Sequence, residues 1–334
     1  MSTEANFREL ISRFAGRRML AIGDLMLDEF IWGRVSRISP EAPVPVVNVT
    51  GESYYPGGAA NVARNLREFT AETAVLGLTG MDTHGQRLVQ LLHVAGIHTE
   101  GVLTDESAFT TVKTRVIARH QQVVRVDRER KTPLTEDQLA RACRYLEQIV
   151  PAVDGIVVAD YGKGFLTQPL ADEICRLARR HGKILAVDPH PHTSLVWRGA
   201  TAIKPNRIEA FSATGLPPAD PVEPVCQDEA LLEAARRLRR LWDAESLLVT
   251  LGEQGMLLFH GEGEPLHLPA RAQEVFDVSG AGDTAIAVFT LGLAAGAAPA
   301  TAAELANRAS SIVVGKVGTA TVTPAELLAA FDAA

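Results

Sequence analysis

Apolar runs rich in β-branched residues alternate with amphipathic stretches over most of the chain, and this alternation is its clearest pattern. The apolar runs predict core strands at residues 19–23, 73–77, 155–159, 184–188, 201–204 and 247–251. The amphipathic stretches predict helices at residues 59–69, 85–95, 136–150, 169–181 and 229–242. Strands and helices that alternate in this way form a parallel sheet covered on both faces. The sequence therefore predicts an α/β protein with a doubly wound, mostly parallel sheet.

Two parts of the chain break this alternation, because strand patterns follow one another there without a helix. Residues 45–49, 110–118 and 122–128 have such patterns, and residues 119–121 join the last two as a hairpin. Valines give the predicted sheet an apolar face: Val44, Val46, Val112, Val116, Val124 and Val126. So small a sheet is poorly stable unless that face is covered. We therefore expect one domain over residues 1–334, with a β lid from about 33–50 and 110–128 that covers an active site or a partner's lid.

The composition is typical of a globular cytoplasmic protein with a small-molecule substrate. The 334 residues are 46% hydrophobic and 22% charged, which suffices for one large core. The net charge is −7, and the basic residues are scattered among acids, which argues against nucleic acid or a membrane as a partner. The three cysteines form no C-x-x-C pair, so neither a zinc site nor a disulfide framework is predicted. No apolar run approaches the roughly 18 residues of a membrane span.

Residues 277–284 carry the most specific chemistry in the chain. Gly280 and Gly282 free the backbone to turn several N–H groups toward one point, at the start of an apolar helix predicted from Thr284 to about residue 295. An anion binds at such a point, and Asp283 beside it can accept the proton of an attacking hydroxyl. The segment thus predicts phosphoryl transfer. From spacing alone, a glycine turn in which Asp283 or Ser279 caps the helix is the alternative.

This segment also resembles a known signature. Gly280-Ala281-Gly282-Asp283, with Asp277 before it, is similar to the C-terminal signature of the ribokinase-like (PfkB) sugar kinases. Residues 57–85, which begin Gly57-Gly58-Ala59-Ala60-Asn61, resemble the N-terminal signature of that family, and residues 204–209 and 250–255 resemble its N-x-x-E element and nucleotide loop. The resemblance covers nearly the whole chain. It implies a ribokinase-like fold and an ATP-dependent carbohydrate kinase, with Asp283 as the catalytic base and Gly280, Ala281 and Gly282 as the anion hole.

Two further runs resemble one branch of that family. Residues 37–46 and the segment Asp160-Tyr161-Gly162-Lys163-Gly164 look like the kinases that phosphorylate D-glycero-β-D-manno-heptose 7-phosphate at its anomeric hydroxyl, on the route to ADP-heptose for lipopolysaccharide. Many members carry a C-terminal nucleotidyltransferase domain, whose H-x-G-H signature is missing from this sequence. The resemblance is therefore to the stand-alone kinase, with a sugar phosphate and ATP as its small-molecule partners. Members commonly dimerise through the lid, so we expect a homodimer.

The resemblance implies a sugar site as well. In it, Asp24 and Asp28 accept hydrogen bonds from sugar hydroxyls, and Gly57, Gly58 and Asn61 complete a polar floor. The phosphate of the sugar needs cations, and the candidates are Lys113, Arg115, Lys163, Arg125 and Arg128. Lys113 and Arg115 lie two apart on one predicted strand, so they share the face opposite Val112, Thr114 and Val116. Each of the five cations could instead lie on a solvated surface or in a surface ion pair.

No G-x-x-x-x-G-K-[ST] phosphate loop is present, so Mg²⁺ and the 280–283 turn must neutralise the phosphates of ATP. The resemblance implies that Glu209 holds Mg²⁺ through water while Asn206 supports the phosphates. The same two residues could form a helix capping box, and both roles are compatible. Thr250, Gly252 and Gly255 should flank the phosphates or ribose, and the adenine should lie against small residues from Asn307 to about 314. A monovalent cation near Asp277 and residues 317–321, as in some relatives, stays open.

Other functions fit the sequence less well. A kinase for fructose 1-phosphate, ribose or a nucleoside would keep Asp283 and Glu209 but lack the run at residues 37–46. A dinucleotide-dependent oxidoreductase would need G-x-G-x-x-G after the first strand, where this chain has Gly23-Asp24-Leu25. A non-catalytic sugar-nucleotide sensor would be expected to have lost the base or the anion hole. Many heptose kinases have D-P-K where this chain has Asp188-Pro189-His190-Pro191-His192, and the H-x-H pair shows no third metal ligand.

Overall fold

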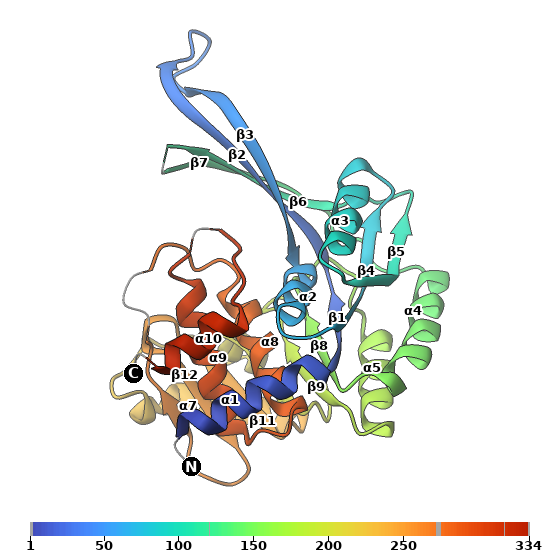
Figure 1. Ribbon diagram of the computed structural model, residues 1–334, viewed down its shortest axis with the longest axis vertical. Coiled ribbons are helices and arrows are strands. Elements are labelled where there is room, and N and C mark those ends of the chain that lie inside the picture. Colours follow the sequence, from blue (N-terminus) through green and yellow to red (C-terminus); the bar gives the residue numbers. More distant parts are fainter. Residues whose placement is uncertain (1–2, 120, 272–274, 317, 333–334) are drawn as a thin grey trace.

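A sheet of nine strands forms the body of the protein in the computed structural model, which describes residues 3–119, 121–271, 275–316 and 318–332 (Figure 1). The strand order is β13-β12-β11-β10-β9-β8-β1-β4-β5, and all neighbours are parallel except those that involve β12 and β13. The strands are β1 (Arg18–Gly23), β4 (Glu72–Gly80), β5 (His98–Asp105), β8 (Gly155–Ala159), β9 (Ile184–Asp188), β10 (Ala202–Ile203), β11 (Ser246–Thr250), β12 (Met256–His260) and β13 (Leu266–Leu268). The predicted fold class is confirmed.

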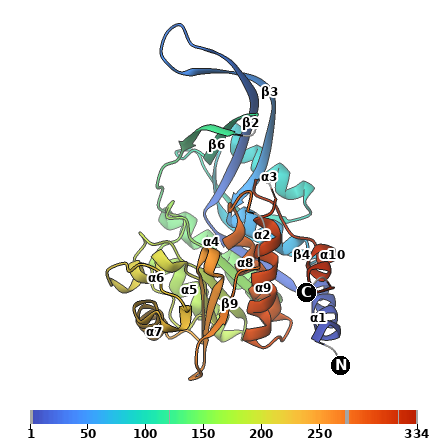
Figure 2. The same ribbon diagram turned by 90° about the vertical axis from the view of Figure 1, so that its left-hand side faces the viewer.

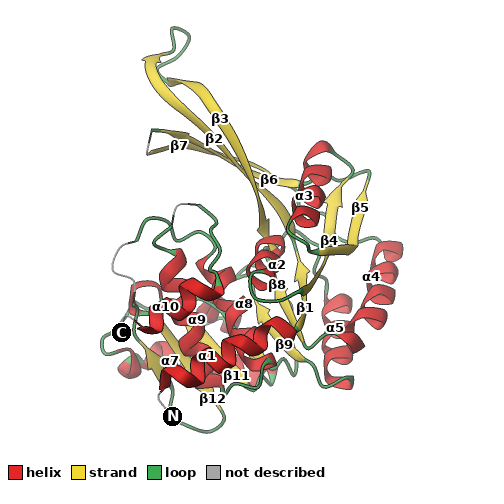
Figure 3. Ribbon diagram, in the orientation of Figure 1, coloured by secondary structure: helices red, strands yellow, loops and turns green. Residues whose placement is uncertain are grey.

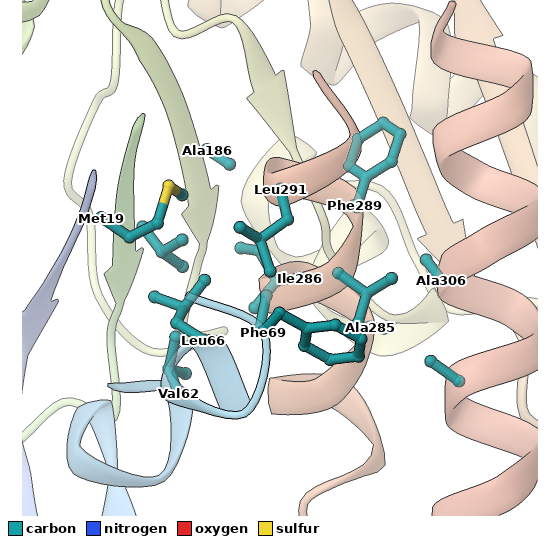
Figure 4. Packing of buried hydrophobic residues seen from close by; sticks show 14 of the residues in the cluster. Met19, Val62, Leu66, Phe69, Ala186, Ala285, Ile286, Phe289, Leu291 and Ala306 are labelled. Carbon is teal, nitrogen blue, oxygen red and sulfur yellow. The ribbon is translucent and has the colours of Figure 1, made fainter. Parts of the chain in front are cut away.

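Helices cover both faces of this sheet, as Figure 2 shows from the side. One face carries α1 (Thr3–Ser12), α2 (Ala59–Arg67), α3 (Thr83–Val94), α8 (Ala281–Ala294), α9 (Pro299–Val313) and α10 (Pro324–Asp332). The other carries α4 (Glu136–Ile149), α5 (Gln168–Arg180), α6 (Arg207–Thr214) and α7 (Glu229–Trp242). Alternate residues of β1 divide between the two cores: Met19 and Ala21 pack on the first, Leu20 and Ile22 on the second. Figure 4 shows Met19 and Leu66 facing Ile286 of α8 in the first core.

The order of the strands reverses beside β1, and this reversal fixes where a ligand can bind. The chain passes from β1 outward to β4 and β5, whereas β8 returns to the other side of β1 and the chain then continues to β9, β10 and β11. Ligands of doubly wound sheets bind outside the carboxyl ends of the strands at such a point. Gly23 ends β1 there, and a Cβ on it would lie 2.0 Å from the carbonyl oxygen of Ala159 at the end of β8. Only glycine permits the two strands to end so close together.

A second sheet of four strands rises from this edge (Figures 1 and 3). It has the order β3-β2-β6-β7 and consists of β2 (Leu25–Ile38), β3 (Pro45–Gly58), β6 (Thr111–Ala118) and β7 (Gln121–Arg128). We call it the lid. The predicted hairpin of β6 and β7 is present, although His120 in its turn lies outside the described residues. The predicted bounds of 33–50 were too short, because β2 begins directly after Asp24 and β3 continues to the first turn of α2.

The two faces of the lid differ in chemistry. Lys113 and Arg115 alternate with Val112, Thr114 and Val116 on β6, so the predicted division of these residues between two faces is confirmed. Val124 and Val126, which pair with Val116 and Thr114, are 46% and 55% exposed. The apolar face thus points away from Lys113 and Arg115 and is partly open to solvent. Within the described part of the chain, no helix has the length and hydropathy that a bilayer crossing requires.

Several elements were not predicted from the sequence. Strand β5 has a mixed pattern of buried and exposed residues at the edge of the sheet, and the antiparallel β12 and β13 follow β11 without an α-helix between them. Helices α1 and α10 were also missed. Helix α8 begins at Ala281 rather than Thr284, because residues 281–283 already have helical geometry despite Gly282. The earlier start places Asp283 inside the first turn.

Candidate active site

The first turn of α8 faces the edge of the sheet where the parallel strands end. Gly280 precedes this turn with a φ of +82°, and a Cβ on it would lie 3.0 Å from Asn61 Nδ2. Glycine avoids both the strain of that left-handed conformation and the contact. Gly280 itself is the N-cap and has no side chain, so the alternative in which Ser279 or Asp283 is the N-cap is wrong. The Ala281 N–H donates to the Val278 carbonyl at 3.3 Å, which leaves the N–H groups of Gly282 and Asp283 and the positive end of the helix dipole to face an anion.

Asp283 is buried in this turn, and two donors from distant segments hold its carboxylate. Asn61 Nδ2 of α2 donates to Oδ2 at 2.7 Å, and the Tyr161 hydroxyl from the loop after β8 donates to Oδ1. Burial raises the pKa of Asp283, while the hydrogen bonds from Asn61 and Tyr161 and the charge of Lys204 oppose the rise. A carboxylate with a raised pKa beside an anion-binding turn is suited to accept a proton.

A buried ion pair adjoins the same turn. Lys204 Nζ lies 3.0 Å from Asp188 Oδ1, and only 4% of the Lys204 side chain is exposed. A Cβ on Gly282 would lie 3.4 Å from that ammonium, so the positive charge is next to the anion-binding backbone. Burial alone would lower the pKa of Lys204, but Asp188, Glu209 and Asp283 together raise it. The ammonium therefore stays charged and can neutralise part of a phosphoryl group.

Asn206 and Glu209 form the capping box of α6, so the structural alternative for these two residues is confirmed. The Asn206 side chain accepts from the Glu209 N–H, and the Glu209 carboxylate accepts from the Asn206 N–H and Nδ2, both at 2.7 Å. Carboxylate oxygens are suitable ligands for Mg²⁺, and because both already accept hydrogen bonds, contact through water is the arrangement that fits. Among the described residues, no three His, Cys, Asp or Glu side chains cluster as a metal site. His190 and His192 therefore have no third ligand there.

A cleft of about 540 Å³ opens beside the first turn of α8. The predicted nucleotide residues Thr250, Gly252, Gly255 and Asn307 all line it, together with Ala281 and Gly282 of the anion-binding turn. Ser310 and Ser311 of α9 and Val314 at its C-terminal end line the same cleft, and a contact of these residues with adenine stays a prediction. Asn206 reaches the same region through a parallel β-bridge to Thr250. The cleft has the volume of a small-molecule site, and it brings the predicted nucleotide residues together with the first turn of α8.

The residues predicted to bind the sugar lie at the base of the lid, apart from Asp24, which precedes it. Asp28 of β2 is buried and forms an ion pair with Arg115 of β6. A Cβ on Gly57 would lie 2.3 Å from Asp28 Oδ2, so glycine is needed for their close approach. Gly58 is the N-cap of α2, and Asn61 lies in the first turn of that helix. The structure thus brings together Asp28, Arg115, Gly57, Gly58 and Asn61. The Asn61 side chain links this group to Asp283 by its hydrogen bond.

Asp24 has different partners from those predicted. Its Oδ2 accepts the N–H groups of Tyr161 at 2.9 Å and Lys163 at 3.1 Å, and its Oδ1 accepts that of Phe165 at 3.2 Å. Burial is the main cause that raises the pKa of Asp24, and the three backbone hydrogen bonds oppose it. Its observed role is therefore to hold the loop after β8, and a contact with the sugar stays a prediction.

The predicted phosphate-binding cations differ in what they contact. Lys163 Nζ forms an ion pair with Glu129 Oε2 at 2.6 Å, and Arg125 Nε forms one with Asp127 Oδ1 at 2.8 Å. The guanidinium carbon of Arg128 lies 5.1 Å from the centre of the Phe109 ring. Lys113 makes no ion pair with a carboxylate in the described chain, and its Nζ lies 5.9 Å from the centre of the Tyr161 ring. Lys163 also lines a cavity beside Asp24, with Arg130 and Thr79. The buried Thr79 hydroxyl has no hydrogen-bond partner among the described residues.

Tyr161 and Lys204 are site residues that the sequence did not assign. Both occur in segments that carry the family resemblance, at residues 160–164 and 204–209, but no role was attached to them. Each follows a core strand within two residues, Tyr161 after β8 and Lys204 after β10. A polar side chain at the carboxyl end of a predicted parallel strand was the available signal, because these ends line the ligand crevice.

A ribokinase-like sheet with a lid, an anion-binding turn and a buried carboxylate beside a nucleotide-sized cleft defines an ATP-dependent sugar kinase. The family model described as pfkB family carbohydrate kinase matches residues 17–326. The chain belongs to this family.

Curated relatives and solved structures agree with that assignment. The chain is 46% identical over 330 residues to a bifunctional protein HldE of Desulfatibacillum aliphaticivorans, and 42% identical over 323 residues to that of Geobacter sulfurreducens. These matches cover 98% and 97% of this chain but 66% and 64% of the relatives. An Arabidopsis thaliana ribokinase complexed with ribose and ATP superposes with a TM-score of 0.71 at 18% identity, covering 94% of this chain and 98% of that one. Phosphofructokinase-2 from Escherichia coli superposes with a TM-score of 0.73 at 20% identity, and the match covers 95% of this chain and 99% of that one.

Replacing Asp283 by Asn tests its assignment as the base. The variant keeps the shape of the side chain but cannot accept the proton of the sugar hydroxyl, so we expect kcat to fall by roughly 10² to 10⁴-fold while both substrates still bind. Steady-state kinetics with Mg-ATP and the best sugar substrate measure this. Asp137→Asn, at an exposed position in α4, is the matched control and should match the parent. Turnover of a folded Asp283→Asn protein within tenfold of the parent would show that another group is the base.

Proposed function

We propose that the protein transfers the γ-phosphate of ATP to the anomeric C1 hydroxyl of D-glycero-β-D-manno-heptose 7-phosphate, which gives the 1,7-bisphosphate for ADP-heptose and the lipopolysaccharide core. The observation that carries the kinase step is the buried carboxylate of Asp283 between the nucleotide cleft and the base of the lid. Support for heptose comes from residues 37–46 and 160–164, which resemble the heptose kinases. The relatives named above are bifunctional proteins, and bifunctionality is common in that branch.

The proposed mechanism follows from the contacts of the site. Asp283 accepts the proton of the C1 hydroxyl as the hydroxyl oxygen bonds to the γ-phosphorus, and the bond from that phosphorus to the bridging β,γ-oxygen breaks so that ADP leaves. The first turn of α8 and Lys204 neutralise the phosphoryl oxygens. Asn206 and Thr250 flank the phosphates, with Gly252, Gly255 and Asn307 around the nucleoside. When bound, Mg²⁺ would neutralise the phosphate oxygens of ATP, and Glu209 would hold it through water. A monovalent cation near Asp277 is not part of this proposal, since Asp277 accepts the N–H groups of Ser279 and Gly318.

On the acceptor side, we assign sugar hydroxyls to Asp28 and Asn61, with Gly57 and Gly58 leaving room for the ring. Asp28 and Arg115 hold each other in place, so Arg115 can orient the carboxylate as well as bind an anion. Lys113 and Lys163 are the proposed ligands of the 7-phosphate. Lys113 is half-buried and pairs with no carboxylate of the described residues, and Lys163 lines the cavity next to Asp24. Burial is the main reason that the pKa of Lys113 is lowered, and an arriving phosphate would reverse that shift.

The outer face of the lid supports a proposed homodimer. Its outer face exposes Val124 and Val126, and β7 at its edge has unpaired backbone groups on one side. An exposed apolar sheet face of this kind is stabilised when a second surface covers it. A second copy of the protein would cover this face with its own apolar lid face. Members of this family commonly dimerise through the lid. ATP and a sugar phosphate are cytoplasmic metabolites, which supports a cytoplasmic location for the enzyme.

A panel of acceptors tests the proposed substrate. ADP release from Mg-ATP should be fastest with heptose 7-phosphate, and heptose without its phosphate should be a poor substrate, because charge-assisted hydrogen bonds from Lys or Arg contribute roughly 1.5–3 kcal/mol each before desolvation. Fructose 1-phosphate, ribose and a nucleoside serve as comparison acceptors. A preference for any of these would identify another sugar kinase of the family, and no turnover with any acceptor would favour a sensor.

Lys163→Ala tests the phosphate contact. We expect kcat/KM for heptose 7-phosphate to fall roughly ten- to a hundredfold, equivalent to about 1.4–2.7 kcal/mol, with little change on free heptose. Arg115→Ala with the same pair of sugars shows whether the lid or the loop after β8 holds the phosphate. Equal losses on both sugars would mean that Lys163 serves ATP or the fold instead.

A further inference from the structure

The loop at residues 160–165, which we call the Tyr161 loop, lies where the strand order reverses, directly after β8 (Figure 1). Its backbone surrounds the carboxylate of Asp24, which accepts N–H groups from Tyr161, Lys163 and Phe165. Backbone N–H groups that converge in this way form an anion-binding loop. Here the anion is a side chain of the protein itself, and only 3% of Asp24 is exposed.

Further contacts hold the Tyr161 loop in one conformation. Asp160 accepts the Gly162 N–H at 2.8 Å and the Thr193 hydroxyl at 2.6 Å, and the Lys163 carbonyl accepts the Thr132 N–H at 2.8 Å. Gly162 and Gly164 have φ values of +69° and +106°. A Cβ on Gly164 would lie 2.7 Å from the Thr132 carbonyl oxygen. So many fixed contacts around a short loop are unusual unless its position matters for the site.

The loop brings the hydroxyl of Tyr161 to the carboxylate of Asp283. This hydroxyl has a single hydrogen, and it donates that hydrogen to Asp283 Oδ1 while Asn61 donates to Oδ2. Burial, followed by the charge of Asp283, raises the pKa of Tyr161 well above its ordinary value, so the hydroxyl remains a donor and is not itself a base. Two donors on two different oxygens fix the plane of the carboxylate. Each oxygen keeps a lone pair for the hydroxyl of the acceptor.

We propose that Tyr161 is a positioning residue for the base Asp283, and that Asp24 acts on the reaction through the Tyr161 loop rather than by binding the sugar. This inference rests on the proposed role of Asp283 as the base. Asp24 suits the anchoring role because three of the roughly four acceptor positions of its carboxylate are already filled by backbone N–H groups. Asp28 differs, because its partner is a side chain, Arg115, at the base of the lid.

Tyr161→Phe tests the proposal, because it keeps the ring and removes only the hydroxyl. We expect kcat to fall roughly ten- to a hundredfold, with KM for sugar and ATP within about twofold of the parent. The acid limb of the kcat profile should move to higher pH, since a carboxylate that loses a donor to its charged form has a higher pKa. The other charges that face Asp283, from Lys204, Asp28 and Asp188, are unchanged in this variant. A purely structural role of Tyr161 would not move the acid limb.

Tyr145→Phe is the matched control. Tyr145 of α4 is half-buried, as Tyr161 is, and it lines a cavity with Arg18, Glu72 and His98 at the opposite end of the strands. Its loss should leave kcat and the pH profile unchanged. A Tyr161→Phe enzyme that behaves like this control would overturn the proposal.

Asp24→Asn tests the second half of the proposal. The amide retains one acceptor oxygen, but its NH₂ faces backbone donors, so the Tyr161 loop should lose its anchor. We expect the same fall in kcat and the same shift of the acid limb, and the double variant with Tyr161→Phe should be little worse than either alone. A raised KM for the sugar, with effects that multiply in the double variant, would show that Asp24 binds the sugar.

A crystal structure of Tyr161→Phe separates this inference from the proposed function. If the parent phosphorylates no sugar tested, the proposed function fails, but the position of the Asp283 carboxylate can still be compared with that in the parent. We expect the carboxylate to rotate about its side-chain bonds once Oδ1 has lost its donor. An unchanged carboxylate, still bonded to Asn61 in the same plane, would overturn the positioning role whatever the substrate.

Discussion

The buried carboxylate of Asp283 is the point on which the rest of the site depends. A buried charge is costly unless hydrogen bonds and opposite charge compensate for it. Here the compensation comes from Asn61, 222 residues away in sequence, from Tyr161, 122 residues away, and from the nearby charge of Lys204. Helix α2, the loop after β8 and helix α8 must therefore all be in place before Asp283 has its observed environment. The fold and the chemistry are linked through this one side chain.

The topology of the sheet explains why these segments meet. Strands β1 and β8 are neighbours at the reversal of strand order, so the residues that follow them, Asp24 and Asp160, lie at one edge. Helix α8 packs on the same face as α2, and Asp283 in its first turn accepts hydrogen bonds from Asn61 and from Tyr161 at that edge. The lid begins directly after Asp24, one residue beyond the end of β1. The cleft lined by Ala281 and Gly282 and the base of the lid, which reaches Asp283 through Asn61, therefore both adjoin the first turn of α8.

Sequence reasoning succeeded where the local pattern and the function coincide. Strands β8 and β9 are almost wholly buried, so their apolar runs identified them, and the 280–283 turn was found from its glycines. It failed where a role depends on backbone contacts or distant partners. Asp24 binds N–H groups of a loop more than 130 residues away, and such contacts leave no trace in the pattern of side chains. The length of β2 was missed because its first residues continue the apolar pattern of β1.

A crystal structure with heptose 7-phosphate and a non-hydrolysable ATP analogue tests the central role of Asp283 most directly. We predict that the C1 hydroxyl lies within about 3 Å of the Asp283 carboxylate, with the γ-phosphate at the first turn of α8. The hydrogen bonds from Asn61 and Tyr161 should be retained. A C1 hydroxyl out of hydrogen-bond reach of Asp283, or a γ-phosphate bound away from residues 280–283, would contradict the proposed site.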